Sequence, residues 1–405
     1  MHRRAFLQSI IAGGASLSCV NRAHAALADM KIKRIRFYQS PQSRPIFNQS
    51  FHVVEVETDA GITGIGEGGS VDTIKQCAGL LIGQSPLRIE HLWQRMYRGF
   101  FYPPGREKLH ALGALDLALW DIKGKALDIP VYELLGGLTR QRLDCYATGF
   151  PGVGGPEEQA RACIDAGFRA FRTSVTGGVA NGRFDSKKSV RLTHQLCRQI
   201  RQGVGDNGEW AIDYHTRLDM PDAIRLSTLI EDLEPVFVED LVRSENPSVY
   251  EQLRPQVKVP IAVGEHFGDR WDINELVEQR LIDYSRVSLP NAGGITEFMK
   301  IAAICETHYV GLIPHFTGPI STAALVHACG AFPGPAMMEM TNGGRTRYAY
   351  LPHSYDFRDG SLWPNQRPGI GVEVDTRQLD LAAEIDGPSQ PIPLYYRPDG
   401  SITNW

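Results

Sequence analysis

The chain has 405 residues, which is more than one small domain needs and suits a large domain with a smaller partner. Apolar residues make up 42% of the chain and charged residues 22%, the composition of an ordinary soluble globular protein. The formal net charge is −4 without a run of like charge, which argues against nucleic acid or an anionic membrane as a partner.

The first 25 residues have the pattern of a targeting segment and are excluded from the fold. Arg3 and Arg4 are followed by an apolar stretch from Ser9 to Val20, and Ala23-His24-Ala25 forms a small-residue cleavage site. The stretch is shorter than the roughly 20 apolar residues that span a bilayer, so no membrane anchor is expected after cleavage. The paired arginines resemble a twin-arginine export signal and predict a periplasmic or secreted protein.

Residues 26–140 read as an α+β unit. Alternating apolar residues predict three strands, Lys31–Phe37, Phe51–Thr58 and Ile62–Gly66. Apolar residues then recur at spacings of three and four between Lys108 and Leu127, which predicts a helix. Pro130 prevents this helix from continuing.

Residues 141–364 repeat a pattern of strand, loop and helix. The predicted strands lie near Cys145, Phe171, Ile212, Val238, Val263, Val287, Ile313 and Met338. Eight such strands in succession predict a parallel barrel, in which catalytic groups lie at the C-terminal strand ends. Residues 365–405 are rich in Pro, Gly and Asp and are expected to return to the N-terminal unit.

Six cysteines remain beyond the targeting segment, and none belongs to a close Cys-x-x-Cys pair. The sequence therefore indicates neither a zinc site nor a disulfide framework. We expect these cysteines to be small buried side chains.

Three acidic residues each follow a predicted barrel strand. Asp213, Glu239 and Glu265 are separated by 26 residues each, which is about the length of one strand-and-helix unit. They should therefore meet at one rim of the barrel, where they would repel one another unless a cation neutralised them. Each acid could instead cap the following helix, but the equal spacing of all three favours a shared site. Oxygen ligands without a thiolate favour Mg²⁺.

These acids, together with further motifs, resemble the enolase superfamily, in particular its mandelate racemase and acid-sugar dehydratase branch. The motifs are Ile89–Trp93, Ala118–Lys125, Pro130–Tyr132, Ala292–Thr296, Pro314-His315 and Pro368–Glu373. The resemblance covers nearly all of the chain after residue 25. It implies an α/β fold, with an N-terminal α+β capping domain on a (β/α)₇β modified TIM barrel. It also implies that Asp213, Glu239 and Glu265 bind Mg²⁺, and that the protein forms a homo-oligomer.

The resemblance places the candidate bases on particular barrel strands. In this sequence, two of those strands depart from the pattern that is common in the superfamily. The second strand carries Arg172-Thr173-Ser174, where many members have Lys-x-Lys, and the sixth strand carries Arg286-Val287-Ser288 without a lysine. This argues against the lysine-based dipeptide epimerases and muconate cycloisomerases. The two arginines resemble the mannonate dehydratase pattern, although no tyrosine lies between Val175 and Ser189.

Two histidines resemble the acid and base of sugar-acid dehydratases. His215 lies in Asp213-Tyr214-His215, and His315 lies on the seventh strand. In the similar galactonate dehydratases, an aspartate supports the seventh-strand histidine, and Ser288 takes its place here. We predict that His315 removes the α-proton and that His215 protonates the departing hydroxyl.

Four further residues are predicted to assist. Glu339 on the eighth strand is expected to orient His315 or to bind the substrate carboxylate. Arg172, Arg286 and Ser174 are expected to bind substrate oxygens.

The function predicted by this resemblance is the Mg²⁺-dependent dehydration of an aldonate-like sugar acid to a 2-keto-3-deoxy acid, through an enolate. Racemisation or epimerisation of a 2-hydroxy acid remains open, since it begins with the same proton abstraction. A non-catalytic secreted protein that binds a sugar acid also remains open. The expected partner in each case is a small acid.

Overall fold

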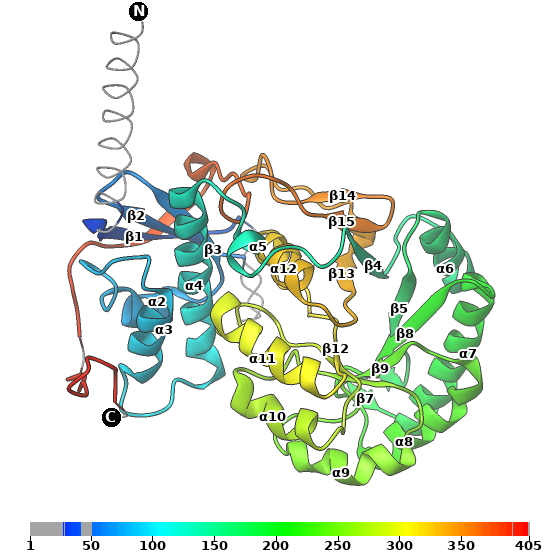
Figure 1. Ribbon diagram of the computed structural model, residues 1–405. Helices are drawn as coiled ribbons and strands as arrows, with labels where there is room; N and C mark the ends of the chain where they lie inside the picture. The colour runs from blue at the N-terminus through cyan, green and yellow to red at the C-terminus, as the bar shows by residue number, and fades with distance from the viewer. Residues whose placement is uncertain (1–26, 28, 42–50, 391, 404–405) are drawn as a thin grey trace, which may run out of the picture.

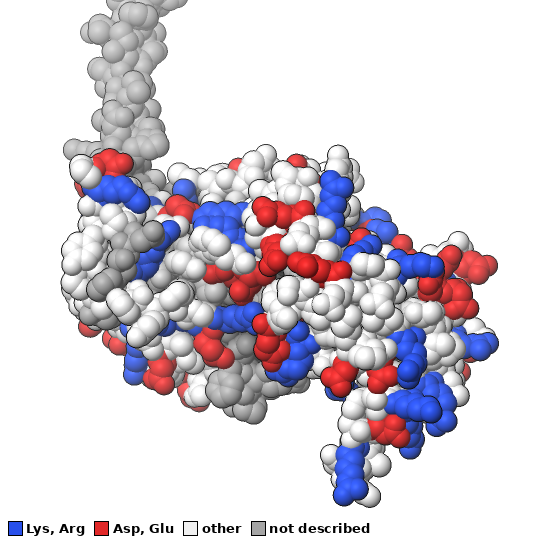
Figure 2. All heavy atoms as spheres, turned by 90° about the horizontal axis from the view of Figure 1, so that it is seen from below, with Lys and Arg blue, Asp and Glu red and all other residues white. Residues whose placement is uncertain are grey.

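The computed structural model describes residues 27, 29–41, 51–390 and 392–403. The targeting segment predicted for residues 1–25 lies outside them. Figure 1 shows a smaller α+β body beside a larger barrel, with α5 (Val131–Leu134) and α12 (Pro319–Ala331) between them. The described residues include no helix with the length and apolarity that crossing a membrane requires. Acidic and basic side chains are interspersed on the face shown in Figure 2.

The smaller body is built on an antiparallel sheet with the strand order β16-β1-β2-β3. Its strands are β1 (Ile32–Gln39), β2 (Val53–Thr58), β3 (Thr63–Glu67) and β16 (Asp380–Ile385), and its helices are α2 (Val71–Ala78), α3 (Ile89–Arg98) and α4 (Gly105–Leu127). The three N-terminal strands were predicted from the sequence. β16 comes from the C-terminal segment and pairs with β1, so both ends of the chain contribute to this sheet.

Helix α4 packs directly against β3 because two glycines let their backbones meet. A Cβ atom at Gly64 would lie 2.1 Å from the Ala118 carbonyl oxygen, and one at Gly66 would lie 1.8 Å from that of Ala114. The predicted helix from Lys108 to Leu127 is confirmed and begins three residues earlier. It ends at Asp128, whose φ of +56° stops the helix before Pro130.

The larger body is the predicted (β/α)₇β barrel. In the described part of the chain, its parallel strands are β4 (Leu143–Thr148), β5 (Ala170–Ser174), β8 (Glu209–Asp213), β9 (Phe237–Glu239), β10 (Ile261–Val263), β11 (Tyr284–Ser285), β12 (Gly311–Leu312) and β13 (Met338–Thr341). Pairing of β13 with β4 closes the barrel. β11 and β12 end just before Val287 and Ile313, the positions near which those strands were predicted.

Seven helical segments surround these strands. They are α6 (Pro156–Asp165), α7 (Ser186–Val204), α8 (Met220–Leu229), α9 (Tyr250–Leu253), α10 (Arg270–Glu278), α11 (Ile295–Thr307) and α12. Two short hairpins also belong to this part of the chain: one of β6 (Val179–Ala180) and β7 (Arg183–Phe184), and one of β14 (Asp356–Arg358) and β15 (Ser361–Trp363) that pairs with β4. All six cysteines beyond the targeting segment are free and buried, as expected.

Buried acids of the capping domain join it to the barrel by capping two barrel helices. Asp116 on α4 accepts hydrogen bonds from the backbone N–H of Thr296 at 3.0 Å and from its hydroxyl at 2.6 Å, at the start of α11. Glu67 at the end of β3 accepts the N–H of Ser321 at 2.8 Å, at the start of α12. Helix N-termini carry unpaired N–H groups and partial positive charge, so each acid stabilises the helix that it meets.

Glu67 makes this contact in a fully buried position. Its Oε1 atom has no hydrogen-bond partner in the described structure, and a Cβ atom at Gly318 would lie 2.4 Å from its Oε2 atom. Burial raises the pKa of Glu67 to about 7 despite the N–H group of Ser321. Because the native state favours the protonated acid, this side chain should make stability depend on pH.

We predict that Glu67→Gln removes part of the pH dependence of stability. The pKa of Glu67 rises from 4.5 to about 7 on folding, so its stabilising contribution is complete below 4.5 and is lost as pH rises through 7. Between about pH 5.5 and pH 8.5, the native protein should lose about 2 kcal/mol of unfolding free energy relative to the variant. Urea unfolding at a series of pH values measures this difference.

Glu384→Gln is the matched control. Glu384 is exposed, and its hydrogen bond with Arg36 lowers its pKa, so it does not titrate in this range. Stability curves of native protein and Glu67→Gln that stay parallel over the same pH range would contradict the prediction.

Candidate active site

A cavity of about 500 Å³ opens at the C-terminal ends of the barrel strands. Its walls include six of the nine residues predicted for the site: Arg172, Asp213, His215, Glu265, His315 and Glu339. Glu239 and Arg286 are fully buried and do not reach the cavity surface. Ser174 ends β5 opposite Asp213 in the strand pairing but is not part of the wall.

The predicted acids are brought together by the parallel strands. Asp213 ends β8 and pairs in register with Glu239, which ends β9. Glu265 follows β10, and Glu339 comes from β13 across the closed barrel. All four side chains are at least nine-tenths buried, so their mutual repulsion is only weakly screened by water.

Two arginines lie between these acids. Nη1 of Arg172 is 2.9 Å from Asp213 Oδ2 and 2.7 Å from Glu239 Oε2, and its Nη2 is 3.2 Å from Glu339 Oε1. Nη2 of Arg286 is 2.9 Å from Glu339 Oε2 and 3.6 Å from Glu265 Oε2, while its Nε contacts Glu239. Two guanidinium groups against four carboxylates leave the cluster negatively charged.

A further group of side chains beside this cluster suits a divalent cation. Asp240, Glu265 and His266 each offer one ligand atom, and these atoms lie within 4.8 Å of one another. Oδ2 of Asp240 and Nε2 of His266 are buried without a hydrogen-bond partner, and they lie 3.4 Å apart. Burial raises the pKa of Asp240, and the nearby charges of Glu265 and Asp213 raise it further. Unpaired ligand atoms and excess negative charge are what a bound divalent cation satisfies.

His315 is held by the hydroxyl group of Ser288. Its Nδ1 is 2.8 Å from the Ser288 hydroxyl, and its Nε2 is 3.5 Å from Glu265 Oε2. Burial lowers the pKa of His315, which favours the neutral imidazole that a base requires. Ser288 can therefore fix the orientation of the ring, but it supplies no negative charge to stabilise an imidazolium.

His215 lies near the other oxygen of the Glu265 carboxylate. Its Nε2 is 3.7 Å from Glu265 Oε1, and about half of its side chain is exposed. The backbone of His215 has a φ of +49°, and its N–H donates to Asp213 Oδ1 at 2.6 Å. The two imidazoles thus flank Glu265, with one buried and one at the cavity rim.

Glu339 is an ionised hydrogen-bond acceptor. Burial alone would raise its pKa, but the charges of Arg286 and Arg172 outweigh this and hold the pKa well below its ordinary value. It also accepts the backbone N–H of Phe316 at 3.0 Å. An ionised carboxylate cannot donate a hydrogen bond to a substrate carboxylate. The contacts of Glu339 instead favour a role in positioning the two arginines and Phe316, the residue after His315.

The other residues that line the active-site cavity were not predicted from the sequence. Thr148 and Thr341 end β4 and β13, and the rule of C-terminal strand ends would have found both. Phe51 from the capping domain packs edge-to-face against Phe316 and Tyr348, with ring centroids 6.3 and 6.1 Å away. Nothing in the sequence pattern marks such residues, because they come from loops that meet only in the folded chain.

The chain is similar to known proteins over most of its length. The model described as "Mandelate racemase / muconate lactonizing enzyme, N-terminal domain" matches residues 39–136, and "Enolase C-terminal domain-like" matches residues 156–378. A curated D-galactonate dehydratase of Xanthomonas oryzae pv. oryzae is 36% identical over 392 residues, covering 93% of this chain and 100% of the relative. That of Pectobacterium atrosepticum is 34% identical over 396 residues, with the same coverage.

Solved structures show the same similarity. A member of the enolase superfamily from Salmonella Typhimurium has a TM-score of 0.80 at 26% identity, covering 88% of this chain and 99% of that one. A mandelate racemase/muconate lactonizing enzyme-like protein from Roseovarius sp. TM1035 has a TM-score of 0.78 at 28% identity, covering 87% and 96%.

We predict that Arg286→Met destabilises the fold by about 3–5 kcal/mol, because it leaves buried carboxylates without their partner. Arg169→Met is the matched control. Arg169 is half exposed and pairs with Glu209 at 2.9 Å, so its loss should cost at most about 1 kcal/mol. Urea unfolding compares the two variants.

Adding Glu339→Gln to Arg286→Met should recover part of the lost stability, since one of the unpaired charges is then removed. Equal destabilisation by Arg286→Met and Arg169→Met would contradict the assigned role of Arg286.

Proposed function

This chain belongs to the mandelate racemase and muconate lactonizing enzyme family of the enolase superfamily, and we propose that it dehydrates a sugar acid to a 2-keto-3-deoxy acid in a Mg²⁺-dependent reaction. Its D-galactonate dehydratase relatives, 34% and 36% identical over nearly the whole chain, support a hydro-lyase that acts on a sugar acid. The observation that carries the proposal is the pair of imidazoles flanking Glu265 in a cavity of buried carboxylates.

The acid cluster would hold the cation. Asp213, Glu239 and Glu265 would be the strand-end ligands, and Asp240 and His266 would add unpaired ligand atoms beside Glu265. A bound divalent cation supplies the concentrated positive charge that makes a proton beside a carboxylate removable. Arg172 and Arg286 keep the acids close together by offsetting part of their repulsion.

The two histidines divide the proton transfers between them. His315 takes the hydrogen from the α-carbon through Nε2, while Ser288 holds Nδ1. The carbon–oxygen bond at the β-carbon then breaks, and His215 protonates the departing hydroxyl, so that water leaves. The resulting enol becomes the 2-keto acid by taking a proton on the β-carbon and losing the proton of its hydroxyl group. Imidazole suits both roles because it titrates near neutral pH.

The cavity also offers groups for a polyhydroxylated substrate. Thr148, Thr341, Asn342 and Thr346 place hydroxyl or amide side chains on its wall, and Phe51 closes part of it with an apolar ring. Such a lining suits hydroxyl groups on a short carbon chain.

We predict that incubation with Mg²⁺ and a panel of sugar acids that includes D-galactonate yields a 2-keto-3-deoxy acid. His315→Asn should lower kcat about 10³-fold, because the base is lost. His215→Asn should lose dehydration but keep exchange of the α-proton with deuterated water, since His315 remains. Product assays and mass spectrometry measure both reactions.

His308→Asn is the control. His308 lies at the end of α11, and its Nδ1 contacts the Ile304 carbonyl, so activity should change less than about twofold. Deuterium incorporation without a keto product in the native protein would instead indicate racemisation or epimerisation. Neither product nor exchange with any acid in Mg²⁺ would contradict an enzymatic role and favour simple binding.

We also propose export to the periplasm through the first 25 residues, on the basis of Arg3-Arg4 and Ala23-His24-Ala25. Changing both arginines to lysine should leave the protein in the cytoplasm, whereas the native protein should be found in the periplasmic fraction. Equal distribution of native and variant protein would contradict this proposal.

A further inference from the structure

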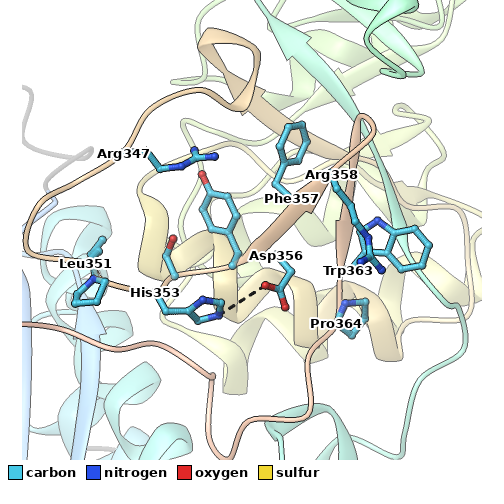
Figure 3. Close-up of a pocket in the computed structure, with 11 residues that line it drawn as sticks. Arg347, Leu351, His353, Asp356, Phe357, Arg358, Trp363 and Pro364 are labelled. Carbon is cyan, nitrogen blue, oxygen red and sulfur yellow. Dashed lines mark ion pairs between the residues drawn. The ribbon is translucent and has the colours of Figure 1, made fainter.

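A second cavity of about 380 Å³ lies in the C-terminal part of the chain (Figure 3). Its wall is formed by hairpin β14–β15 and the segment that precedes it. Figure 3 shows Arg347 on one side and the stacked Arg358 and Trp363 on the other, with His353 and Asp356 along one edge. The proposed dehydration uses none of these side chains.

The charge of this cavity favours an anion. Nη1 of Arg347 donates to the carbonyls of Gly344 at 2.9 Å and Thr346 at 2.8 Å, which fixes the arginine at the cavity. Arg358 lies over the Trp363 ring, 4.2 Å from its centroid. Within the described chain, neither arginine forms an ion pair with a carboxylate, so both guanidinium groups keep their charge for a ligand.

Two buried nitrogen atoms at this cavity have no hydrogen-bond partner in the described structure. They are Nε1 of Trp363 and Nε2 of His353, which is 4.0 Å from Asp356 Oδ1. An indole N–H can only donate, and leaving it buried and unpaired costs free energy. A ligand oxygen beside Trp363 would remove this cost.

We propose that this cavity is a binding site for a small carboxylate that carries hydroxyl groups. The planar guanidinium groups of Arg347 and Arg358 bind the carboxylate. The Trp363 N–H donates to a ligand oxygen, and Asp356 accepts from a hydroxyl. The ring of Phe357 packs against the C–H groups of the ligand.

The chain connects this cavity to the active site. Asn342, Thr346 and Tyr348 line the active-site cavity, whereas Arg347, between two of them, lines the second one. A ligand held by Arg347 therefore restrains the segment that also contacts the substrate, which lowers the cost of ordering it when substrate binds. This coupling rests on the proposed function, whereas the binding site itself does not.

The indole N–H resonance of Trp363 provides a direct test. Its NMR signal is assigned by its absence in Trp363→Phe, and D-galactonate is titrated into native protein. We expect this resonance to shift with saturation. Galactitol, which lacks the carboxylate, and acetate, which lacks the hydroxyls, should each bind at least fivefold more weakly.

Arg358→Gln should weaken binding of D-galactonate at this site at least fivefold, whereas the matched control Arg377→Gln should not. Arg377 is exposed and pairs with Asp375 at 2.7 Å, outside the cavity. In activity assays, Arg358→Gln should raise KM two- to fivefold and leave kcat unchanged, because Arg358 does not touch the active-site cavity.

An unchanged Trp363 resonance, or binding that survives Arg358→Gln, overturns the site. Acetate binding as tightly as D-galactonate overturns the requirement for hydroxyl groups. Binding without any effect of Arg358→Gln on KM overturns the coupling alone. A shifted Trp363 resonance in a protein that dehydrates no acid supports the site and contradicts the proposed function.

Discussion

The structure depends on gathering four buried carboxylates at the ends of neighbouring barrel strands. Asp213, Glu239, Glu265 and Glu339 would repel one another strongly in a site that water reaches poorly. Two arginines offset part of this charge through direct contacts, and the remaining negative charge suits the divalent cation that we propose. The same negative charge thus explains the buried arginines and suits the proposed metal, and it surrounds the histidine that we propose as the base.

The capping domain is joined to the barrel by the same type of interaction, in which a buried acid meets positive charge. Asp116 and Glu67 meet the N-termini of α11 and α12, whose N–H groups supply the complementary partial charge. The second of these helices follows His315 along the chain. These contacts between the capping domain and the barrel therefore also fix the segment that carries the proposed base, and they place Phe51 on the cavity wall.

The proposed base is supported by a hydroxyl group, that of Ser288. The hydroxyl reaches Nδ1 of His315 and can orient the ring, but it cannot stabilise a positive imidazolium as a carboxylate would. Glu265 and Glu339 lie close enough for their charges to act on His315, so part of that support comes from the acid cluster itself. The proposed base is thus supported by Ser288 and by the acid cluster together.

The sequence alone determined the order of the barrel strands and the strand-end acids, because both follow from local periodicity and from the length of one strand-and-helix unit. It could not show that Arg172 and Arg286 bind protein carboxylates, that Asp240 and His266 lie beside Glu265, or that residues 342–348 line two cavities. Contacts such as Arg172 with Glu339 exist only because β13 pairs with β4 and closes the barrel. Tertiary structure decided these points, since which charges become neighbours depends on residues far apart in the chain.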